Sequence, residues 1–341
     1  MNKFYTILLY FVVLIPAEKM AAQDLTYSQF YEQPLLRNPA LAGVFTGDMR
    51  ISTAYRDQWE SVTVPFRTTS LSAEYKLPAS KNKDVFTLGT QLTVDAAGDI
   101  RLRRTQLLPA ICFHKSLNTE NDTYLSVAFI GGLVNSQFDQ TLAIFGDQYQ
   151  NGTVSSNTSS QPLKATGYSY FDVSTGVALS TNFADNGHIY IGAALSHFNR
   201  PAIKTTTGIS TYNLPEKYTL NFGINYPLDE RSRIIGYADY FAQNGGRQLL
   251  VGALYGMDVQ NYYDTDPYTI YFGSFVRWND SFIPVIKMDF QHYSVGLSYD
   301  VNISKLIVAS NYRGGFEFTA VYKGFLTVTN EALQKVKCVN F

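Results

Sequence analysis

Residues 268–299 alternate large apolar side chains with small or polar ones over a longer span than an ordinary half-buried sheet needs. In the first third of this stretch, aromatic and aliphatic residues share one side, while Thr269, Gly273 and Arg277 occupy the other. This period of two is that of a β-strand. Tyr268 and Trp278 are separated by about 25 Å along a tilted strand, the height of the apolar band of an outer-membrane barrel. The stretch therefore predicts three strands with aromatic girdles at both membrane interfaces.

The same alternation recurs along most of the chain from Met49 onward. The cleanest example is 218–226, where Tyr218 and Phe222 share one face and Thr219 and Asn221 the other. Strands are expected at residues 49–56, 68–76, 85–95, 105–115, 123–134, 168–180, 189–198, 218–226, 233–241 and 248–257, in the three parts of 268–299, and at 316–322. An even total of about 14 lies within the range of bacterial barrels. The sequence thus predicts an all-β fold, a single transmembrane antiparallel β-barrel.

The composition agrees with a membrane barrel. The chain has 25 Tyr and 23 Phe but only 16% charged residues, while its mean hydropathy is −0.10. A barrel shows lipid every second residue, so its average hydropathy stays near zero even though its surface is apolar. The formal net charge of −1 gives no electrostatic reason to expect nucleic acid as a partner.

The chain divides into four segments. Residues 1–22 have a basic start, an apolar run too short to span a bilayer and a small-residue end at Ala21 and Ala22, as a secretory signal peptide does. Residues 23–48 have no clean period and carry Pro34 and Pro39, so they are expected outside the sheet, as a plug or a periplasmic lead-in. The barrel is expected at 49–322, and 323–341 is expected to form a periplasmic tail.

The lengths of the connections predict which end of the barrel faces outward. Outer-membrane barrels have short periplasmic turns and longer extracellular loops. With both termini periplasmic, the short links 77–84, 116–122, 182–187 and 227–231 are periplasmic, whereas 135–167, 199–216 and 302–315 are extracellular. These three links are the longest, as expected if successive connections alternate between the periplasmic and the extracellular end.

Charged side chains within the strands are expected to face the lumen, because a cation on the lipid face near the bilayer centre costs about 2–4 kcal/mol. The mixed signs of these residues suggest a lumen closed by its own salt bridges, whereas an ion-selective pore tends toward one sign. The candidate lumen residues are Arg50, Arg56, Glu74, Asp172, Arg277, Asp300 and Glu317.

No catalytic, cofactor or metal motif rises above background. The sequence has no G-x-S-x-G, H-E-x-x-H, P-loop or paired-cysteine site. The four histidines lie in separate strands or turns, where lumen or interface roles are expected. Cys112 lies in a strand pattern and Cys338 in the tail, so a small core residue is favoured over a disulfide. The sequence predicts a protein that is not an enzyme.

Several segments resemble the PorP/SprF family of type IX secretion outer-membrane proteins. They occur in the family's order and cover nearly all of the chain from Gln23 to Tyr322. They are QDLTYSQF at 23–30, NPALAG at 38–43, YRDQW at 55–59, FDVSTG at 171–176, YIG at 190–192 and VGLSYDVN at 295–302. The resemblance carries no catalytic residues. It implies an exported, non-enzymatic outer-membrane barrel of the type IX secretion and gliding machinery.

The resemblance also implies partners, without deciding which of them this chain serves. They are the periplasmic ring subunits of the machinery, a peptidoglycan-binding lipoprotein, and a large secreted surface adhesin whose export or attachment depends on its barrel. A passive or substrate-selective porin is the alternative function. Candidate partner-contact residues are Asn38, Pro39 and Gly43 in the lead-in, and Gln58 and Trp59 at the first outer loop. A Trp at that position is also explained as an interfacial anchor.

Overall fold

The computed structural model describes residues 24–59, 64–79, 83–150, 152–154, 166–183, 187–204, 211–259, 268–305 and 307–325. The predicted signal peptide, Cys338 and residues 326–341 of the predicted tail lie outside this range. Within it, no helix has the length and apolarity to cross a bilayer.

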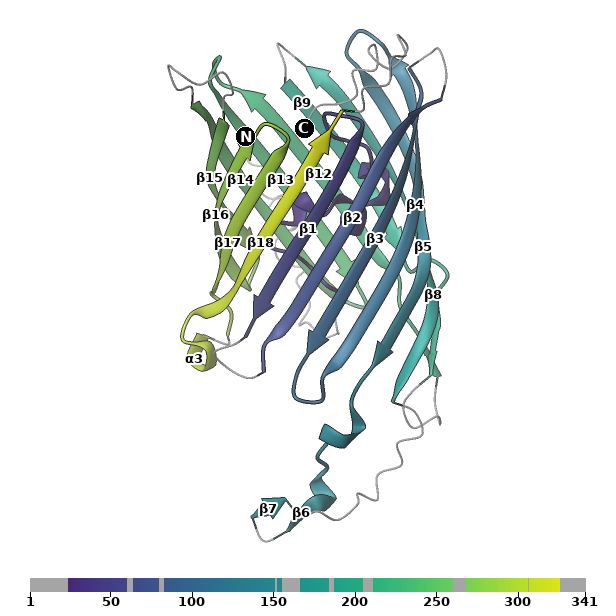
Figure 1. Cartoon of the computed structure of the whole chain (residues 1–341), viewed down its shortest axis with the longest axis vertical. Coiled ribbons are helices and arrows are strands. Elements are labelled where there is room, and N and C mark those ends of the chain that lie inside the picture. The colour runs from purple at the N-terminus through teal and green to yellow at the C-terminus, as the bar shows by residue number, and fades with distance from the viewer. Residues whose placement is uncertain are drawn as a thin grey trace, which may run out of the picture.

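The strands form one closed antiparallel barrel, in which each strand pairs with its neighbours in sequence and the first pairs with the last (Figure 1). The closing seam joins β1 to β18, with Ile51 opposite Tyr322 and Arg56 opposite Glu317. The 14 strands of the barrel are β1 (Met49–Gln58), β2 (Phe66–Pro78), β3 (Val85–Ala97), β4 (Leu102–Asn118), β5 (Thr123–Gln137), β8 (Gly167–Phe183), β9 (Gly187–Ser196), β12 (Lys217–Pro227), β13 (Ser232–Gln243), β14 (Gly246–Val259), β15 (Tyr268–Arg277), β16 (Ser281–Phe290), β17 (Tyr293–Asn302) and β18 (Arg313–Gly324). The predicted fold class is confirmed.

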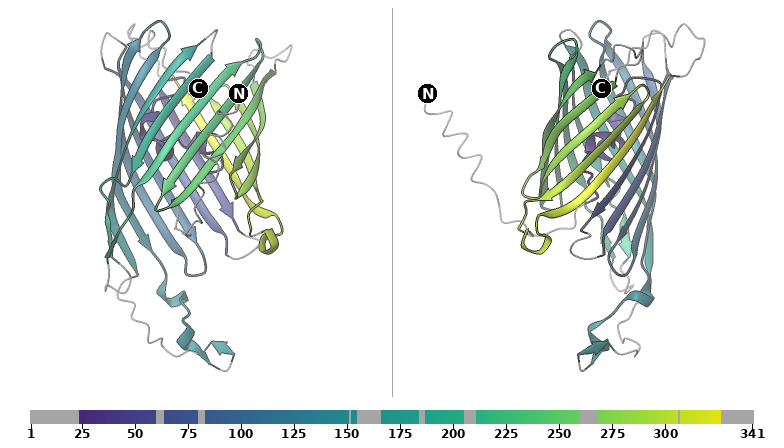
Figure 2. Two further views of the ribbon diagram at one scale, coloured as in Figure 1. Left: turned by 180° about the vertical axis from the view of Figure 1, so that it is seen from behind. Right: turned by 60° about the vertical axis from the view of Figure 1, so that its left-hand side comes forward.

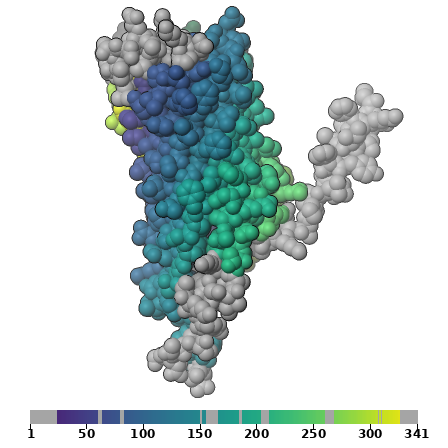
Figure 3. All heavy atoms as spheres, turned by 90° about the vertical axis from the view of Figure 1, so that its right-hand side faces the viewer, coloured from purple at the N-terminus to yellow at the C-terminus, as the bar shows by residue number. Residues whose placement is uncertain are grey.

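Burial alternates along the strands with the period that the sequence predicts. In β16, Ile283 and Val285 are buried while Phe282 and Ile286 are exposed, and β5 and β12 show the same pattern. The space-filling view of Figure 3 shows one side of the barrel, coloured blue to green, as a continuous surface. The exposed apolar face is the lipid-facing surface, and the buried face turns toward the lumen.

The strands differ in length, so the wall is higher on one side. β4 and β8 have 17 residues each, whereas β15, β16 and β17 have 10. Strand ends differ from the sequence prediction by a few residues. The strand expected to reach Phe198 stops at Ser196, because His197 has a φ of +57° and breaks the extended run. The last strand continues past Tyr322 to Gly324.

The three longest connections, 138–166, 197–216 and 303–312, all leave the same end of the barrel. They carry the hairpins β6 (Tyr149–Gln150) with β7 (Thr153–Val154) and β10 (Ala202–Lys204) with β11 (Thr211–Asn213), and the single-turn helix α3 (Ile307–Ser310). In Figure 1 this end is at the bottom, and the β6–β7 hairpin projects well beyond the wall. We call it the outer end and the opposite one the periplasmic end, following the loop asymmetry of outer-membrane barrels.

Candidate functional site

The lumen is occupied by the protein's own N-terminal segment, residues 24–48, which we call the plug. It folds into three short helices, η1 (Phe30–Glu32), α2 (Pro34–Arg37) and η2 (Pro39–Leu41). Both views of Figure 2 show it inside the barrel, enclosed by strands on all sides. Most of its residues are buried. Pro34 and Pro39 each stand at the start of a helix, where the missing N–H is not needed and the fixed φ is favourable.

The plug begins at the outer end, where three cations surround Asp24. Its carboxylate lies 3.0 Å from Arg104, 3.3 Å from His197 and 3.7 Å from Lys217. His197 also contacts Asp172, at 2.8 Å. Burial alone would raise the pKa of Asp24, but Lys217 and Arg104 more than offset it and hold this pKa well below its usual range. The charged carboxylate therefore fixes the outer end of the plug.

Two carboxylates of the barrel wall, Glu317 and Asp300, bind Ser28 and Gln29 of the plug. The Glu317 carboxylate accepts hydrogen bonds from the backbone N–H groups of Ser28 and Gln29, each at 2.7 Å. Asp300 accepts one from the Ser28 hydroxyl and pairs with Arg56 at 2.8 Å and Arg277 at 3.1 Å. The N–H groups of Ser28 and Gln29 have no partner within a helix, and Glu317 of the barrel wall accepts their hydrogen bonds. These buried backbone donors are therefore satisfied without water.

Aromatic packing holds the middle of the plug against β13 and β15. Tyr31 stacks on Tyr237 with ring centroids 4.9 Å apart, and Phe30 meets Phe275 edge-on at 5.4 Å. Phe275 is completely buried. Such pairs contribute about 0.5–1.5 kcal/mol each beyond the burial of their area.

Arg37 makes the most enclosed ion pair of the plug. Its Nε and Nη2 each donate to Asp239 on β13 at 2.6 Å, and Nη2 also donates to the Tyr190 hydroxyl on β9 at 3.1 Å. Arg37 and Asp239 are both buried. A neighbouring ion pair joins Glu32 to Lys287 on β16 at 2.7 Å.

Glycines in the wall make room for amide side chains of the plug. A Cβ on Gly176 would lie 2.0 Å from the Asn38 side-chain oxygen, and one on Gly296 would lie 2.1 Å from the Gln29 side-chain oxygen. Asn38 uses this space to donate to the carbonyl of Val177 at 3.2 Å and to accept from the N–H of Ala40. These glycines are required for close approach, not for a turn.

The plug ends at the periplasmic end, beside the closing seam. The N–H of Gly43 donates to Glu74 on β2 at 2.8 Å, and Arg50 on β1 donates twice to the same carboxylate. Phe45 lies under the cations of Arg50 and Lys76, at 4.5 and 4.3 Å. The N–H of Asp48 donates to the carbonyl of Gly324, the last residue of β18. The plug therefore bonds strands on both sides of the seam.

The structure places the seven candidate lumen residues inside the barrel, all of them buried. Six of them form two groups, Arg50 with Glu74 at the periplasmic end, and Arg56, Arg277, Asp300 and Glu317 toward the outer end. The seventh, Asp172, pairs with His197. Sequence reasoning expected them to pair with one another across the lumen. It did not foresee that Glu74, Asp300 and Glu317 would also bind the backbone or side chains of the plug.

The candidate partner-contact residues lie in two places. Asn38, Pro39 and Gly43 are buried against the barrel wall, as expected of a plug, which is one of the two arrangements that the sequence left open for residues 23–48. Their role as partner contacts stays a prediction. Gln58 and Trp59 line an open cavity of about 360 Å³ at the outer end, together with Trp278. Trp59 has a φ of +65°, which is unusual for a bulky residue.

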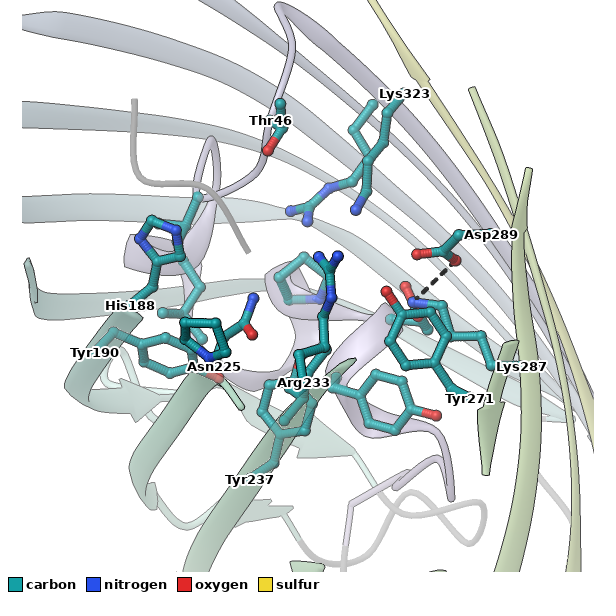
Figure 4. Close-up of a pocket in the computed structure, with 18 of the residues that line it drawn as sticks. Thr46, His188, Tyr190, Asn225, Arg233, Tyr237, Tyr271, Lys287, Asp289 and Lys323 are labelled. Atoms are coloured by element: carbon teal, nitrogen blue, oxygen red, sulfur yellow. Dashed lines mark ion pairs between the residues drawn. The ribbon is translucent and has the colours of Figure 1, made fainter. Parts of the chain in front are cut away.

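The larger cavity, which we call the periplasmic cavity, has a volume of about 540 Å³. It lies between the plug and the strands β1, β9, β12, β13, β15, β16 and β18, and Thr46 and Glu230 form part of its exposed rim. Tyr190, Tyr237 and Tyr271 line its sides in Figure 4, where Arg233 and Lys323 extend toward its middle and Lys287 pairs with Asp289. No sequence pattern indicated this cavity, because its lining comes from the plug and from strands far apart in the chain.

The histidines and Cys112 occupy separate buried or interfacial positions. His114 bonds Ser126 at 2.7 Å, His188 bonds Asn182 at 2.6 Å and His292 packs on Tyr322. Cys112 is buried and forms no disulfide within the described part of the chain. Across the same described residues, no three His, Cys, Asp or Glu side chains are grouped as a metal site requires.

Comparison with known proteins points to one family. The family model described as "Type IX secretion system membrane protein PorP/SprF" matches residues 19–322. No curated protein matches the chain. Among solved structures, the toluene transporter TbuX of Ralstonia pickettii has a TM-score of 0.50 at 10% identity, covering 86% of this chain and 93% of that one. The toluene transporter TodX of Pseudomonas putida has a TM-score of 0.46 at 11% identity, with 84% and 91% covered.

Proposed function

Since the chain belongs to the PorP/SprF family of type IX secretion system membrane proteins, we propose that it supports the export or surface attachment of a large secreted protein, such as an adhesin. It is an outer-membrane β-barrel component of that system, and in our proposal it acts without catalysis. The proposed partners are the periplasmic ring subunits or a peptidoglycan-binding lipoprotein on one side and the secreted client on the other.

The filled lumen is the observation that carries this proposal. The plug is bonded to the wall at its outer end by Asp24, in its middle by Arg37 and at its periplasmic end by Gly43. A client chain could cross this barrel only if all of these contacts were broken, including buried ion pairs whose disruption costs about 3–5 kcal/mol each. The protein is therefore proposed to act through its two exposed ends, and not as the conduit.

Removal of the plug tests this role. Deleting residues 24–48 behind an intact signal peptide is expected to abolish surface display of the client while leaving a heat-modifiable barrel in the outer membrane. Surface display is measured by labelling intact cells, and the barrel by the shift of its gel mobility on heating. Gly146→Ala, in the outer loop with open space around it, is the matched control and should display the client normally. Normal display by the deletion variant would contradict the proposal.

A porin is the second candidate, because charged residues line the lumen and an open cavity lies at each end. Liposomes that contain the purified protein and swell when placed in solutions of small sugars would favour the porin, because swelling measures the entry of the sugar. Co-purification of a very large secreted protein or of ring subunits would favour the secretion role.

A further inference from the structure

Both tryptophans of the chain line one cavity, the open one of about 360 Å³ at the outer end. We call it the outer cavity. Its volume falls within the roughly 300–1,000 Å³ of ligand pockets. Trp59 directly follows the last residue of β1, and Trp278 directly follows the last residue of β15. Barrel closure therefore brings two large aromatic side chains from distant parts of the chain to the same opening.

Backbone hydrogen bonds hold both tryptophans at this opening. The N–H of Trp59 donates to the carbonyl of Gly314 at 3.0 Å, and the N–H of Trp278 donates to the carbonyl of Leu249 at 2.9 Å. Trp59 keeps a φ of +65°, a strained conformation of the kind that clusters at ligand sites. Trp278 is 62% exposed, so a ligand arriving from outside can reach it.

The remainder of the lining is polar. Every other residue of the lining carries a hydrogen-bonding side chain, and among the described residues the lining contains no aliphatic one. These residues are Thr26, Arg56, Gln58, Arg247, Gln248, Arg277 and Asp280. A hydrocarbon or an apolar peptide side chain would leave such groups unpaired, whereas a ligand rich in hydroxyl groups would satisfy them.

Three of these polar side chains have no partner within the described part of the protein. The amides of Gln58 and Gln248 and the guanidinium of Arg247 make no hydrogen bond or ion pair with other described residues. All three residues are at least partly exposed. Each amide offers donors and an acceptor, and a sugar hydroxyl also both donates and accepts. The unpaired groups therefore match hydroxyls better than they match an ion of one sign.

The charges at the outer cavity are balanced. Among the described residues, three arginines and three carboxylates lie in its lining or directly behind it. They are Arg56, Arg247 and Arg277, and Asp280, Asp300 and Glu317. Arg277 pairs with Asp280 at 2.9 Å, and Arg56 pairs with Asp300 at 2.8 Å. This balance gives no preference for an anion or a cation and favours an uncharged ligand.

The plug contributes to the outer cavity through Thr26, whose carbonyl accepts a hydrogen bond from Arg56. The cavity is therefore complete only when the plug lies inside the barrel. A ligand bound here contacts the plug and the barrel wall together, and a ligand that binds only the native state stabilises it.

We propose that the outer cavity binds a small uncharged saccharide from the outer side of the membrane. The apolar faces of its rings pack on Trp59 and Trp278, and its hydroxyls bond to the amides of Gln58 and Gln248. Anchoring in the lipid interface explains an exposed tryptophan, but it does not explain the unpaired polar groups beside both of them. The inference goes beyond the proposed function and does not depend on it.

A printed array of neutral and acidic oligosaccharides tests the class of ligand. The purified, fluorescently labelled protein is applied in a detergent without a sugar head group, because such a head group would compete. We expect binding to a subset of the neutral oligosaccharides, and calorimetry then measures the affinity for the strongest of them. Absence of binding to any saccharide would overturn the proposal. Binding confined to acidic saccharides would do the same, because charge would then select the ligand.

Replacement of one tryptophan tests the site. Trp278→Ala should weaken binding of that oligosaccharide at least tenfold, whereas Trp278→Phe, which keeps an aromatic face, should retain most of the affinity. Tyr149→Ala is the matched control, because Tyr149 is 61% exposed in an outer loop and lies outside the cavity lining. It should change the affinity less than twofold. Equal losses in Trp278→Ala and Tyr149→Ala would contradict the assignment of the site.

A second variant tests the hydrogen bonds without removing a ring. Gln248→Leu keeps a side chain of similar size but loses the amide, and it should weaken binding at least fivefold. Gln140→Leu, at an exposed outer-loop position outside the lining, should leave the affinity unchanged. Heat modifiability verifies that each variant forms a barrel. Unchanged affinity in a folded Gln248→Leu barrel would show that the saccharide binds elsewhere.

Competition identifies the source of the saccharide. Lipopolysaccharide purified from the same cells and soluble polysaccharide from their medium are each added to the parent protein with the array oligosaccharide. Displacement by lipopolysaccharide would assign the ligand to the membrane surface, and displacement by the soluble polysaccharide alone would assign it to the medium. Either result supports a saccharide site, whereas equal displacement of the oligosaccharide from the parent and from Trp278→Ala would overturn it.

Discussion

Arg37 and Asp239 face each other inside the barrel, 202 positions apart in the chain, and form two hydrogen bonds of 2.6 Å. Neither side chain is accessible to more than a trace of solvent. The pair links the plug to β13 at about the midpoint of the plug. It can form only when the plug is bound inside the barrel.

Truncating Arg37 should therefore destabilise the protein strongly. Arg37→Ala leaves Asp239 buried without its partner, and we expect a loss of about 3–5 kcal/mol in the free energy of unfolding. Denaturant unfolding followed by tryptophan fluorescence measures this loss. Replacing both residues with apolar ones, Arg37→Met with Asp239→Leu, should recover much of it. Arg200→Ala, which breaks the exposed pair with Glu216, should cost less than about 1 kcal/mol.

The wall glycines should tolerate no added methyl group. Gly176→Ala would push on the Asn38 amide, and overpacking of this kind costs about 1–3 kcal/mol. Adding Asn38→Ala should relieve the clash, so the double variant is expected to be more stable than Gly176→Ala alone in the same unfolding measurement. A Gly176→Ala barrel as stable as the parent would mean that the plug does not approach β8 as closely as described.

The plugged lumen should not conduct as a large pore. Single-channel recordings of the intact protein in planar bilayers are expected to show no large, stable opening. Deleting residues 24–48 removes the occupant, so steady step currents should appear. Large currents from the intact protein would show that the plug leaves the lumen readily.

The outer end of the plug should weaken in alkali. Burial lowers the pKa of His197, but hydrogen bonds to Asp172 and Asp24 outweigh it and raise this pKa to about 9. A raised pKa means that the stabilisation is complete below the ordinary value of 6.5 and is lost as pH rises through about 9. Asp24 has a lowered pKa, so it stays charged throughout this window. Arg104 and Lys217 also face Asp24.

We therefore expect the midpoint temperature of heat modification of the parent protein to decrease as the pH is raised from 7 to 10. His197→Gln should start lower at pH 7 and show a smaller further decrease. The same pH dependence in both proteins would assign the effect to another group.

The periodic alternation of the sequence was enough to predict the barrel, its 14 strands and the inward direction of its charged residues. Each of these depends on local information, because successive residues of a strand must face opposite sides and a charge cannot face lipid cheaply. The predicted strand at 189–198 ran too long because a single backbone angle at His197 decides where it ends. The alternation of apolar and polar residues does not predict such a backbone angle.

The sequence by itself thus determined which residues face lipid and which face inward, and its motifs indicated the family. Only the tertiary structure decided what the inward residues bind. Glu317 meets Ser28 across 289 positions, and Gly176 makes room for Asn38 from a different part of the chain. Such contacts arise from barrel closure around the plug, and the pattern of either segment alone does not name its partner. For the same reason no sequence pattern indicated the periplasmic cavity, which is assembled from the plug and seven strands.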